Sequence, residues 1–135
     1  MRHKNPIKLR SFGSAPRTLG LVLLLGHSGS VFAENPVTPD AASVTRGGQV
    51  FQQYCTECHG RDGKAQVDVI SDATDLTEPE AYYSGASEQD IFNSISNGAG
   101  VAMPAWNVQI ADETDIWHLV YFIRSLWTEE QRAAF

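Results

Sequence analysis

Cys55-Thr56-Glu57-Cys58-His59 is the stretch that decides the fold, because two thiols and an imidazole at this spacing are what covalent attachment of a haem requires. Cys55 and Cys58 can each add to one vinyl group of the macrocycle and form a thioether bond. His59 follows at once, and a neutral imidazole is the common proximal ligand of haem iron. Because its side chain is held beside a tethered macrocycle, its effective concentration for coordination is high. The motif predicts one covalent haem c.

Three other interpretations of the two cysteines each need something that the sequence lacks. A tetrahedral zinc site takes four ligands, but after residue 33 the chain has two cysteines and, beyond His59, only His118 as a further histidine. A thioredoxin-like redox pair would follow a strand, whereas the residues around Cys55 have helical spacing. A structural disulfide suits an oxidising compartment, but it leaves the adjacent His59 unexplained.

Residues 1–33 predict a cleavable signal peptide and not a part of the fold. The leader is positive, with five basic residues, Arg2, Lys4, Lys8, Arg10 and Arg17. A short apolar run, Leu19 to Leu25, follows, and Val31-Phe32-Ala33 places small residues where a signal peptidase cleaves. An uncleaved anchor is the alternative, but a membrane span needs ~20 apolar residues and this run soon meets His27 and Ser28. We expect cleavage after Ala33 and export to the periplasm.

Removal of the leader leaves a strongly acidic chain. Five of the 10 Lys and Arg residues lie in residues 1–33, and all 16 Asp and Glu residues lie after it, so five basic against 16 acidic residues give a net charge of −11. This charge excludes a nucleic-acid partner and favours redox partners with basic docking surfaces. The alternative is that the acidity only secures solubility.

The remaining chain is long enough for one domain, near the lower end of what builds an apolar core unaided. Residues 34–42, with Pro36 and Pro39 and little periodicity, predict a flexible mature N-terminus. Residues 43–135 form the predicted domain. A buried haem would supply much of its core, as an apolar plate against which short helices can pack.

Three helices are predicted from apolar residues at helical spacing. The first runs from about Ser43 to Tyr54 and leads directly into the haem motif. The second follows Ser87, an N-cap candidate, and ends at Gly98. The third opens with acidic residues at Asp112, and its apolar stripe consists of Ile116, Leu119, Val120, Phe122, Ile123 and Leu126. Nothing resembles a run of alternating strands, so the predicted class is all-α.

A long connection, Gly60 to Ala86, lies between the first two of these helices. It is rich in Gly, Asp, Ser and Thr. Loops of this length in a compact domain usually have a function or an object to wrap around, and a haem edge would be that object. We expect Leu76, Tyr82 and Tyr83 to turn inward, with partly exposed loop aromatics as the alternative.

The second axial ligand is predicted by elimination and by local sequence. Met103 is the one methionine after residue 33, and a thioether is a soft ligand that raises the potential of haem iron. Around it, Gly100 allows close backbone approach, Pro104 stiffens the exit and Trp106 can pack beside the ring. A core-filling role is the alternative. The rival ligand, His118, is predicted to be a surface residue, because it shares the more polar face of the third helix with Thr114, Tyr121 and Ser125.

From Val44 to Trp127 the chain resembles the class I c-type cytochromes. Their Gly-x-x-x-Phe-x-x-x-Cys-x-x-Cys-His opening is matched by Gly47, Phe51, Cys55, Cys58 and His59. Their distal loop is matched by Met103-Pro104, and their last helix by Leu119 and Phe122. The fuller pattern is similar to the subgroup also found as c-type domains in haem-copper oxidases and periplasmic dehydrogenase partners; it consists of Asp62-Gly63-Lys64, Asp75-Leu76-Thr77, Asp90-Ile91-Phe92, Asn97-Gly98 and Met103-Pro104-Ala105-Trp106.

The resemblance implies the cytochrome c fold, with three main helices and loops wrapped around one covalently bound haem. It also implies that Gly47 and Phe51 meet the last helix. Two departures from the family pattern matter. No proline lies between His59 and Pro79 to offer a carbonyl to the proximal imidazole, so another backbone carbonyl must do so. Ala111 stands where relatives often have a capping Ser or Thr, which leaves Asp112 as the cap.

The function that the resemblance implies is that of a soluble one-electron carrier and not of an enzyme. Cys55 and Cys58 would attach the haem, and His59 and Met103 would be its axial ligands. The expected partners are a quinol-oxidising complex, a dehydrogenase, a reductase or a terminal oxidase, with no stable membrane insertion and with a monomeric state. The alternative is a haem-based gas sensor or peroxidase-like enzyme with an open sixth position. A structural module with a Cys55 to Cys58 disulfide is a third interpretation.

Overall fold

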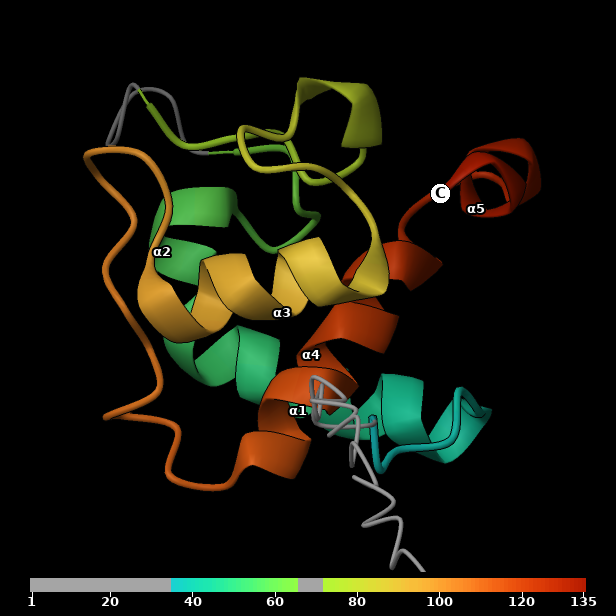
Figure 1. Ribbon diagram of the computed structural model, residues 1–135, viewed down its shortest axis with the longest axis horizontal. Helices are drawn as coiled ribbons and strands as arrows, with labels where there is room; N and C mark the ends of the chain where they lie inside the picture. Colours follow the sequence, from blue (N-terminus) through green and yellow to red (C-terminus); the bar gives the residue numbers. More distant parts are fainter. Residues whose placement is uncertain (1–34, 66–71) are drawn as a thin grey trace, which may run out of the picture. The chain divides into compact units, whose positions relative to one another are not determined.

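The computed structural model describes residues 35–65 and 72–135, and these residues form helices and loops without a strand (Figure 1). The elements are α1 (Ala41–Tyr54), α2 (Thr56–His59), the 3-10 helix η1 (Pro79–Ala81), α3 (Glu88–Asn97), α4 (Glu113–Ser125) and α5 (Glu129–Ala134). The all-α class is therefore confirmed. None of the described helices has the length and apolar character needed to cross a bilayer. The predicted leader, residues 1–33, lies outside the described residues.

The side chains that cap the helices set where they begin. Asp40 accepts a hydrogen bond from the Ser43 amide at 2.8 Å, so α1 begins at Ala41, two residues before the predicted start. Ser87 and Asp90 form a capping box at the start of α3, so Ser87 is the N-cap, as predicted. The unpredicted α5 begins with a Thr128 to Gln131 capping box. This Thr-x-x-Gln spacing is a sequence signal that could have indicated α5.

Asp112 caps α4, as predicted, and gives that helix a dependence on pH. Its carboxylate accepts from the Thr114 hydroxyl at 2.6 Å and from the Thr114 amide at 3.0 Å. These bonds lower the pKa of Asp112 below its ordinary value of 3.8. The cap therefore stabilises fully above that value and is lost as the pH falls through the lower, folded-state pKa.

We expect Asp112→Asn, whose amide oxygen can still cap, to reduce the loss of stability on acidification. Urea unfolding of parent and variant at neutral and at strongly acidic pH measures this difference. An acid-induced loss of the same size in both proteins would show that the Asp112 carboxylate does not contribute.

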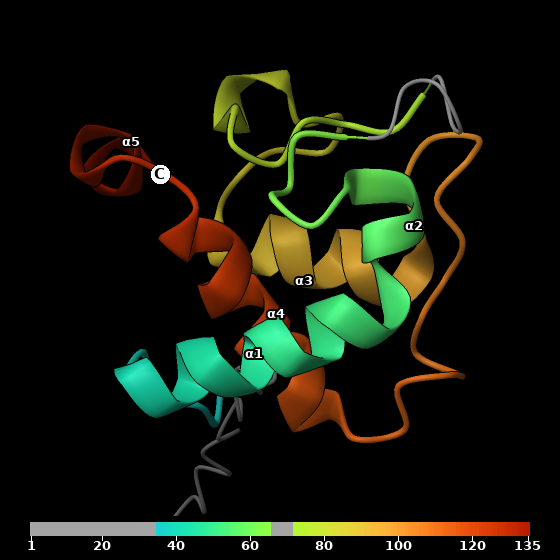
Figure 2. The ribbon, with the colours of Figure 1, turned by 180° about the vertical axis from the view of Figure 1, so that it is seen from behind.

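The core is built where α1 lies across α4 (Figure 2). Gly47 is at the crossing, since a Cβ there would lie 2.0 Å from the carbonyl oxygen of His118 and 2.8 Å from Cβ of Phe122. Phe51 is fully buried, and its ring centroid is 4.9 Å from that of Phe122. The expected contact of Gly47 and Phe51 with the last helix is thus present. On another side α4 packs against α3, where Phe92 stacks on Trp117.

His118 is not the surface residue that the helical pattern predicted. Its side chain is half-buried, and its Nδ1 lies 2.8 Å from the hydroxyl of Ser43, which is only 2% exposed. Arg46 makes a two-point ion pair with Asp115 beside it. The part of the polar face of α4 around His118 is therefore partly covered by α1. The prediction was wrong because periodicity shows which face of a helix is polar, but not which element covers it.

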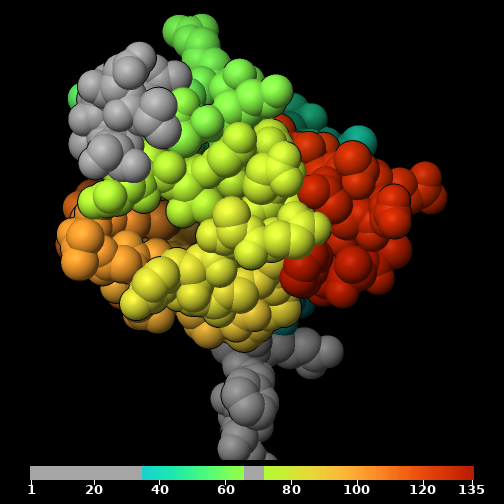
Figure 3. Space-filling view, turned by 90° about the horizontal axis from the view of Figure 1, so that it is seen from above, coloured from blue at the N-terminus to red at the C-terminus, as the bar shows by residue number. Residues whose placement is uncertain are grey.

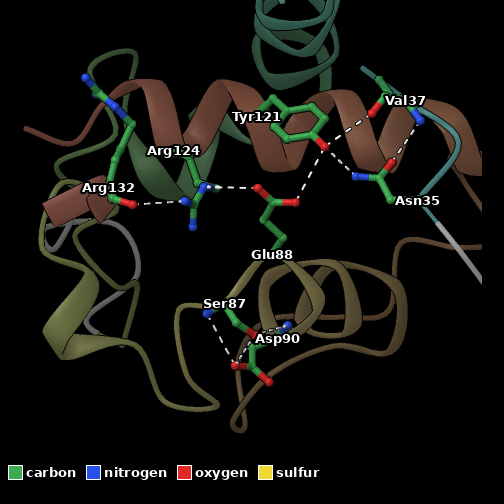
Figure 4. Close-up of polar contacts among 8 residues, drawn as sticks. All are labelled: Asn35, Val37, Ser87, Glu88, Asp90, Tyr121, Arg124 and Arg132. Carbon is green, nitrogen blue, oxygen red and sulfur yellow. Dashed lines mark hydrogen bonds and ion pairs between the residues drawn. The ribbon is translucent and has the colours of Figure 1, made fainter. Parts of the chain in front are cut away.

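The segment before α1 is attached to α4 through Tyr121, as Figure 4 shows. The Asn35 side-chain amide donates to the Tyr121 hydroxyl at 2.5 Å, and this hydroxyl lies 3.2 Å from the carbonyl oxygen of Val37. Glu88 of α3 lies 3.5 Å from the same hydroxyl and 3.6 Å from Arg124. Part of the predicted flexible N-terminus, residues 34–42, is thus hydrogen bonded, and its last two residues belong to α1.

Candidate haem-binding site

A cavity opens between the haem motif and two loops. It is lined by residues 72–74, residues 99–104 and the tight turn that carries the motif. The segment that begins at residue 72, in yellow-green, and the loop after α3, in orange, lie beside a hollow in the surface in Figure 3. The wider part of the cavity has a volume of about 520 Å³, within the ~300–1,000 Å³ of cofactor and ligand pockets. The deeper part is lined by buried apolar residues such as Phe51, Leu119 and Ile123.

The sequence motif folds into one turn that brings its three functional side chains together. Cys55 ends α1 with its amide bonded to the Phe51 carbonyl, and the His59 amide bonds back to the Cys55 carbonyl at 2.9 Å. Cys55, Cys58 and His59 all line the cavity. Gly60 then ends α2 with a φ of 71°, a conformation that favours glycine. The turn matches the local geometry expected from the sequence.

His59 is oriented by a backbone carbonyl of the long connection. Its Nδ1 lies 3.0 Å from the carbonyl oxygen of Thr74. Since a carbonyl only accepts, Nδ1 carries the proton and Nε2 keeps its lone pair. Burial lowers the pKa of His59, although the bond to Thr74 opposes the shift, so the neutral ring is favoured. No described residue hydrogen bonds Nε2. Thr74 thus provides the backbone carbonyl that was expected in place of the proline of the family pattern. Nothing in the sequence distinguished Thr74 from its neighbours for this role.

The two cysteines are free thiols, and both are partly buried. Burial, with a further contribution from the Cys58 thiol, raises the pKa of Cys55 to about 12. A tetrahedral zinc site needs four ligands. Among residues 35–65 and 72–135, no group of three or more His, Cys, Asp or Glu side chains is placed to hold a metal ion. The donor set does not fit the zinc alternative.

Met103 reaches the same cavity from the loop after α3. It is half-buried and packs against the edge of the core. Its backbone pairs with that of Ala99 in both directions, at 3.1 and 3.3 Å. Trp106 lines the cavity as expected and packs against Tyr54, with ring centroids 5.8 Å apart. Gly100, in contrast, makes no close approach, because a Cβ there would meet open space. His118 does not line the cavity.

The arrangement fits a haem. A soft sulfur donor and a neutral imidazole come from two different segments, and apolar side chains make up most of the wall between them. A low-polarity wall and few polar groups are typical of sites that hold a large planar cofactor. The thiols of Cys55 and Cys58 line the cavity together with His59, so thioether bonds to a haem could form there.

Residues 42–123, more than half of the chain, match the protein family described as cytochrome c oxidase, cbb3-type, subunit III. The chain belongs to this family. The chain is similar to the cbb3-type cytochrome c oxidase subunit FixP of Azorhizobium caulinodans, 31% identical over 87 residues, which cover 64% of this chain and 28% of FixP. The subunit CcoP of Rhodobacter capsulatus is 38% identical over 68 residues, 50% of this chain and 22% of CcoP. The chain thus matches less than a third of the length of either relative.

Two solved structures of c-type cytochromes have the same fold as this chain. Cytochrome cL of Methylophaga aminisulfidivorans has a TM-score of 0.56 at 23% identity, covering 71% of this chain and 67% of its own. Cytochrome c6 of the diatom Phaeodactylum tricornutum has a TM-score of 0.51 at 24% identity, covering 67% and 95%. The fold is therefore the cytochrome c fold. The chain is a c-type cytochrome domain for electron transfer, and its family implies haem c as the cofactor.

The connection that offers the Thr74 carbonyl is itself attached to the end of α4. The carbonyl of Leu76 accepts from the Trp127 indole at 2.9 Å and from the Tyr82 hydroxyl at 2.8 Å. Leu76 and Tyr82 turn inward as predicted. Tyr83 does not, since it lines the cavity mouth with 82% of its surface exposed. The connection is thus held at Leu76 by Trp127, just after the end of α4.

The Leu76 carbonyl accepts from both Trp127 and Tyr82, so substitutions of these two donors should have non-additive effects on the free energy of unfolding. We expect Trp127→Phe and Tyr82→Phe each to cost about 1 kcal/mol in the free energy of unfolding, because the other donor remains. The double variant leaves the Leu76 carbonyl without either donor, so its cost should exceed the sum by about 1 kcal/mol. Urea unfolding of all four proteins measures this coupling, and strictly additive costs would contradict the shared acceptor.

Proposed function

We propose that this chain is a one-electron carrier that holds one haem c through Cys55 and Cys58, with His59 and Met103 as axial ligands, and that it is not an enzyme. The observation that carries the proposal is that all four of these residues line one cavity. The tautomer of His59 supports it, because Nε2 is left as the free nitrogen. Bound in this cavity, the haem would supply one-electron exchange between ferric and ferrous iron.

The residues of the site favour electron transfer over substrate chemistry. With His59 and Met103 both bound to the iron, no coordination position would stay open to a substrate. Thr74 holds the His59 ring, and the Ala99 to Met103 pairing holds the distal loop. These fixed contacts suit a change of oxidation state with little rearrangement. The cavity mouth is rimmed by exposed apolar side chains, among them Tyr83 and Val101, over which a partner can approach.

The proposal places the carrier in the periplasm, after cleavage of residues 1–33 as a signal peptide, as a soluble monomer without stable membrane insertion. The net charge of −11 after the leader supports brief, salt-sensitive docking on basic surfaces and no nucleic-acid partner. A terminal oxidase is one such partner, in keeping with the names of the relatives. A quinol-oxidising complex, a dehydrogenase and a reductase are the others.

Absorption spectra of the exported, purified protein test this proposal. We expect covalent haem, sharp low-spin bands in the reduced state, and the weak far-red sulfur-to-iron band in the ferric state. Carbon monoxide should bind the reduced protein poorly at neutral pH. High-spin haem that binds carbon monoxide readily would instead support the gas sensor or peroxidase-like alternative. Protein without covalent haem, made with an intact maturation system, would overturn both.

A further inference from the structure

The loop that carries Met103 is folded back on the end of α3. The last turn of α3 leaves carbonyls without helical partners, and two of them accept from the returning chain. The Trp106 amide donates to the Ile95 carbonyl at 3.0 Å and the Asn107 amide to the Ser96 carbonyl at 3.4 Å. Together with the backbone pairing of Ala99 and Met103, these bonds make a narrow hairpin against the helix end.

Gly98 lies where the returning segment comes closest to α3. Its φ of 86° and ψ of 163° belong to a region that almost only glycine occupies. A Cβ at this position would lie 2.7 Å from the carbonyl oxygen of Met103, 3.1 Å from the carbonyl carbon of Pro104 and 3.1 Å from the amide nitrogen of Ala105. All three are backbone atoms, which cannot rotate away as the tip of a side chain can. A side chain here must therefore push the segment that contains Met103 away from α3.

We propose that Gly98 is a positioning residue for Met103. Its missing side chain lets the returning backbone lie against the end of α3, and this places the Met103 side chain at the cavity wall. The inference rests on the proposed function, since the position of this sulfur matters when it is an axial ligand. Gly100 provides the comparison within the same loop. It also has a positive φ, 58°, but no atom lies within 4 Å of a Cβ built there.

Spectra of the full-length, exported, haem-loaded protein test the inference, with Gly98→Ala compared with Gly100→Ala and the parent. Both positions have a positive φ, but an added Cβ would meet the Met103 segment only at Gly98. We expect Gly98→Ala to keep covalent haem, to lose the far-red sulfur-to-iron band and to bind carbon monoxide when reduced. Gly100→Ala should keep the band and stay closed to carbon monoxide.

Two results would overturn the role of Gly98 alone. A Gly98→Ala protein with the parent's band, even if it melts earlier, would show that Gly98 only ends α3. Loss of the band in both variants would show that strain in the turn, and not the contact at Gly98, displaces Met103. A parent without the band would overturn the His59 and Met103 ligation, and this inference with it, before any variant is compared.

A second variant serves if Gly98→Ala yields no haem protein. Ala99→Pro removes the N–H that donates to the Met103 carbonyl, because a ring carbon takes the place of the amide hydrogen, and the extended ψ of Gly98 suits a residue before proline. We expect the far-red band to be weakened or lost here as well. A band equal to that of the parent would overturn the claim that this backbone contact positions Met103.

Discussion

Gly47→Ala is expected to destabilise the protein by about 3 kcal/mol or more, a large part of the 5–15 kcal/mol that holds a typical domain folded. The added Cβ would lie 2.0 Å from the carbonyl oxygen of His118 and 2.5 Å from its carbonyl carbon. These are atoms of the α4 backbone, so α1 and α4 must move apart and the packing of Phe51 on Phe122 must open. Urea unfolding and thermal melting of the haem-loaded protein, followed by circular dichroism, measure the loss.

Gly48→Ala is the matched control for this effect. It adds the same methyl group one residue along α1, but there the Cβ would meet only ring atoms of Phe122, at 3.2 Å. The gain in helix propensity, up to ~1 kcal/mol, should offset much of that contact. We expect a change within about 1 kcal/mol of the parent. Equal stabilities of the Gly47→Ala and Gly48→Ala proteins would contradict the close crossing at Gly47.

Met103→Ala is expected to lower the reduction potential by roughly 0.1 V or more, a modest part of the ~0.8 V range over which axial ligands tune haem iron. Alanine offers no ligand atom, so the ferric protein should lose the far-red band and the reduced protein should bind carbon monoxide. The haem should remain attached, because Cys55 and Cys58 lie in another segment. Redox titration and spectra of the purified variant measure these changes.

Val101→Ala is the control for Met103→Ala. Val101 is in the same loop and lines the cavity mouth, but the residue is 96% exposed and its side chain carries no ligand atom. We expect a potential and a spectrum close to those of the parent. A Met103→Ala protein that matches the Val101→Ala protein in both would exclude Met103 as the axial ligand.

Local signals in the sequence predicted much of this fold. The haem motif, the Ser87 and Asp112 caps and the apolar stripe of α4 each depend on residues within one or two helical turns. The Gly47 contact is long-range, and it was predicted from the resemblance to a family and not from periodicity. Of the candidate site residues, all four line one cavity, while their roles in attaching the haem and binding its iron are still predictions.

The features that the sequence did not reveal are contacts between distant backbones. Any carbonyl of the long connection could have faced His59, and the choice of Thr74 depends on how α4 holds Leu76. The close approach predicted at Gly100 lies instead at Gly98, because the hairpin returns across the end of α3. His118 is covered for a similar reason. A single residue type does not tell which distant segment will lie beside it.

The crossing of α1 and α4 also bears on how the folded protein opens. It joins positions about 70 residues apart, as the Arg46 to Asp115 pair illustrates with a separation of 69. The loop after α3 lies between these joined ends and holds to α3 by a few backbone bonds, so it can detach while the crossing stays intact. Amide hydrogens of residues 99–107 should therefore exchange with solvent well before those at the centres of α1 and α4. The protein would then lose the distal wall of its cavity before it loses its core.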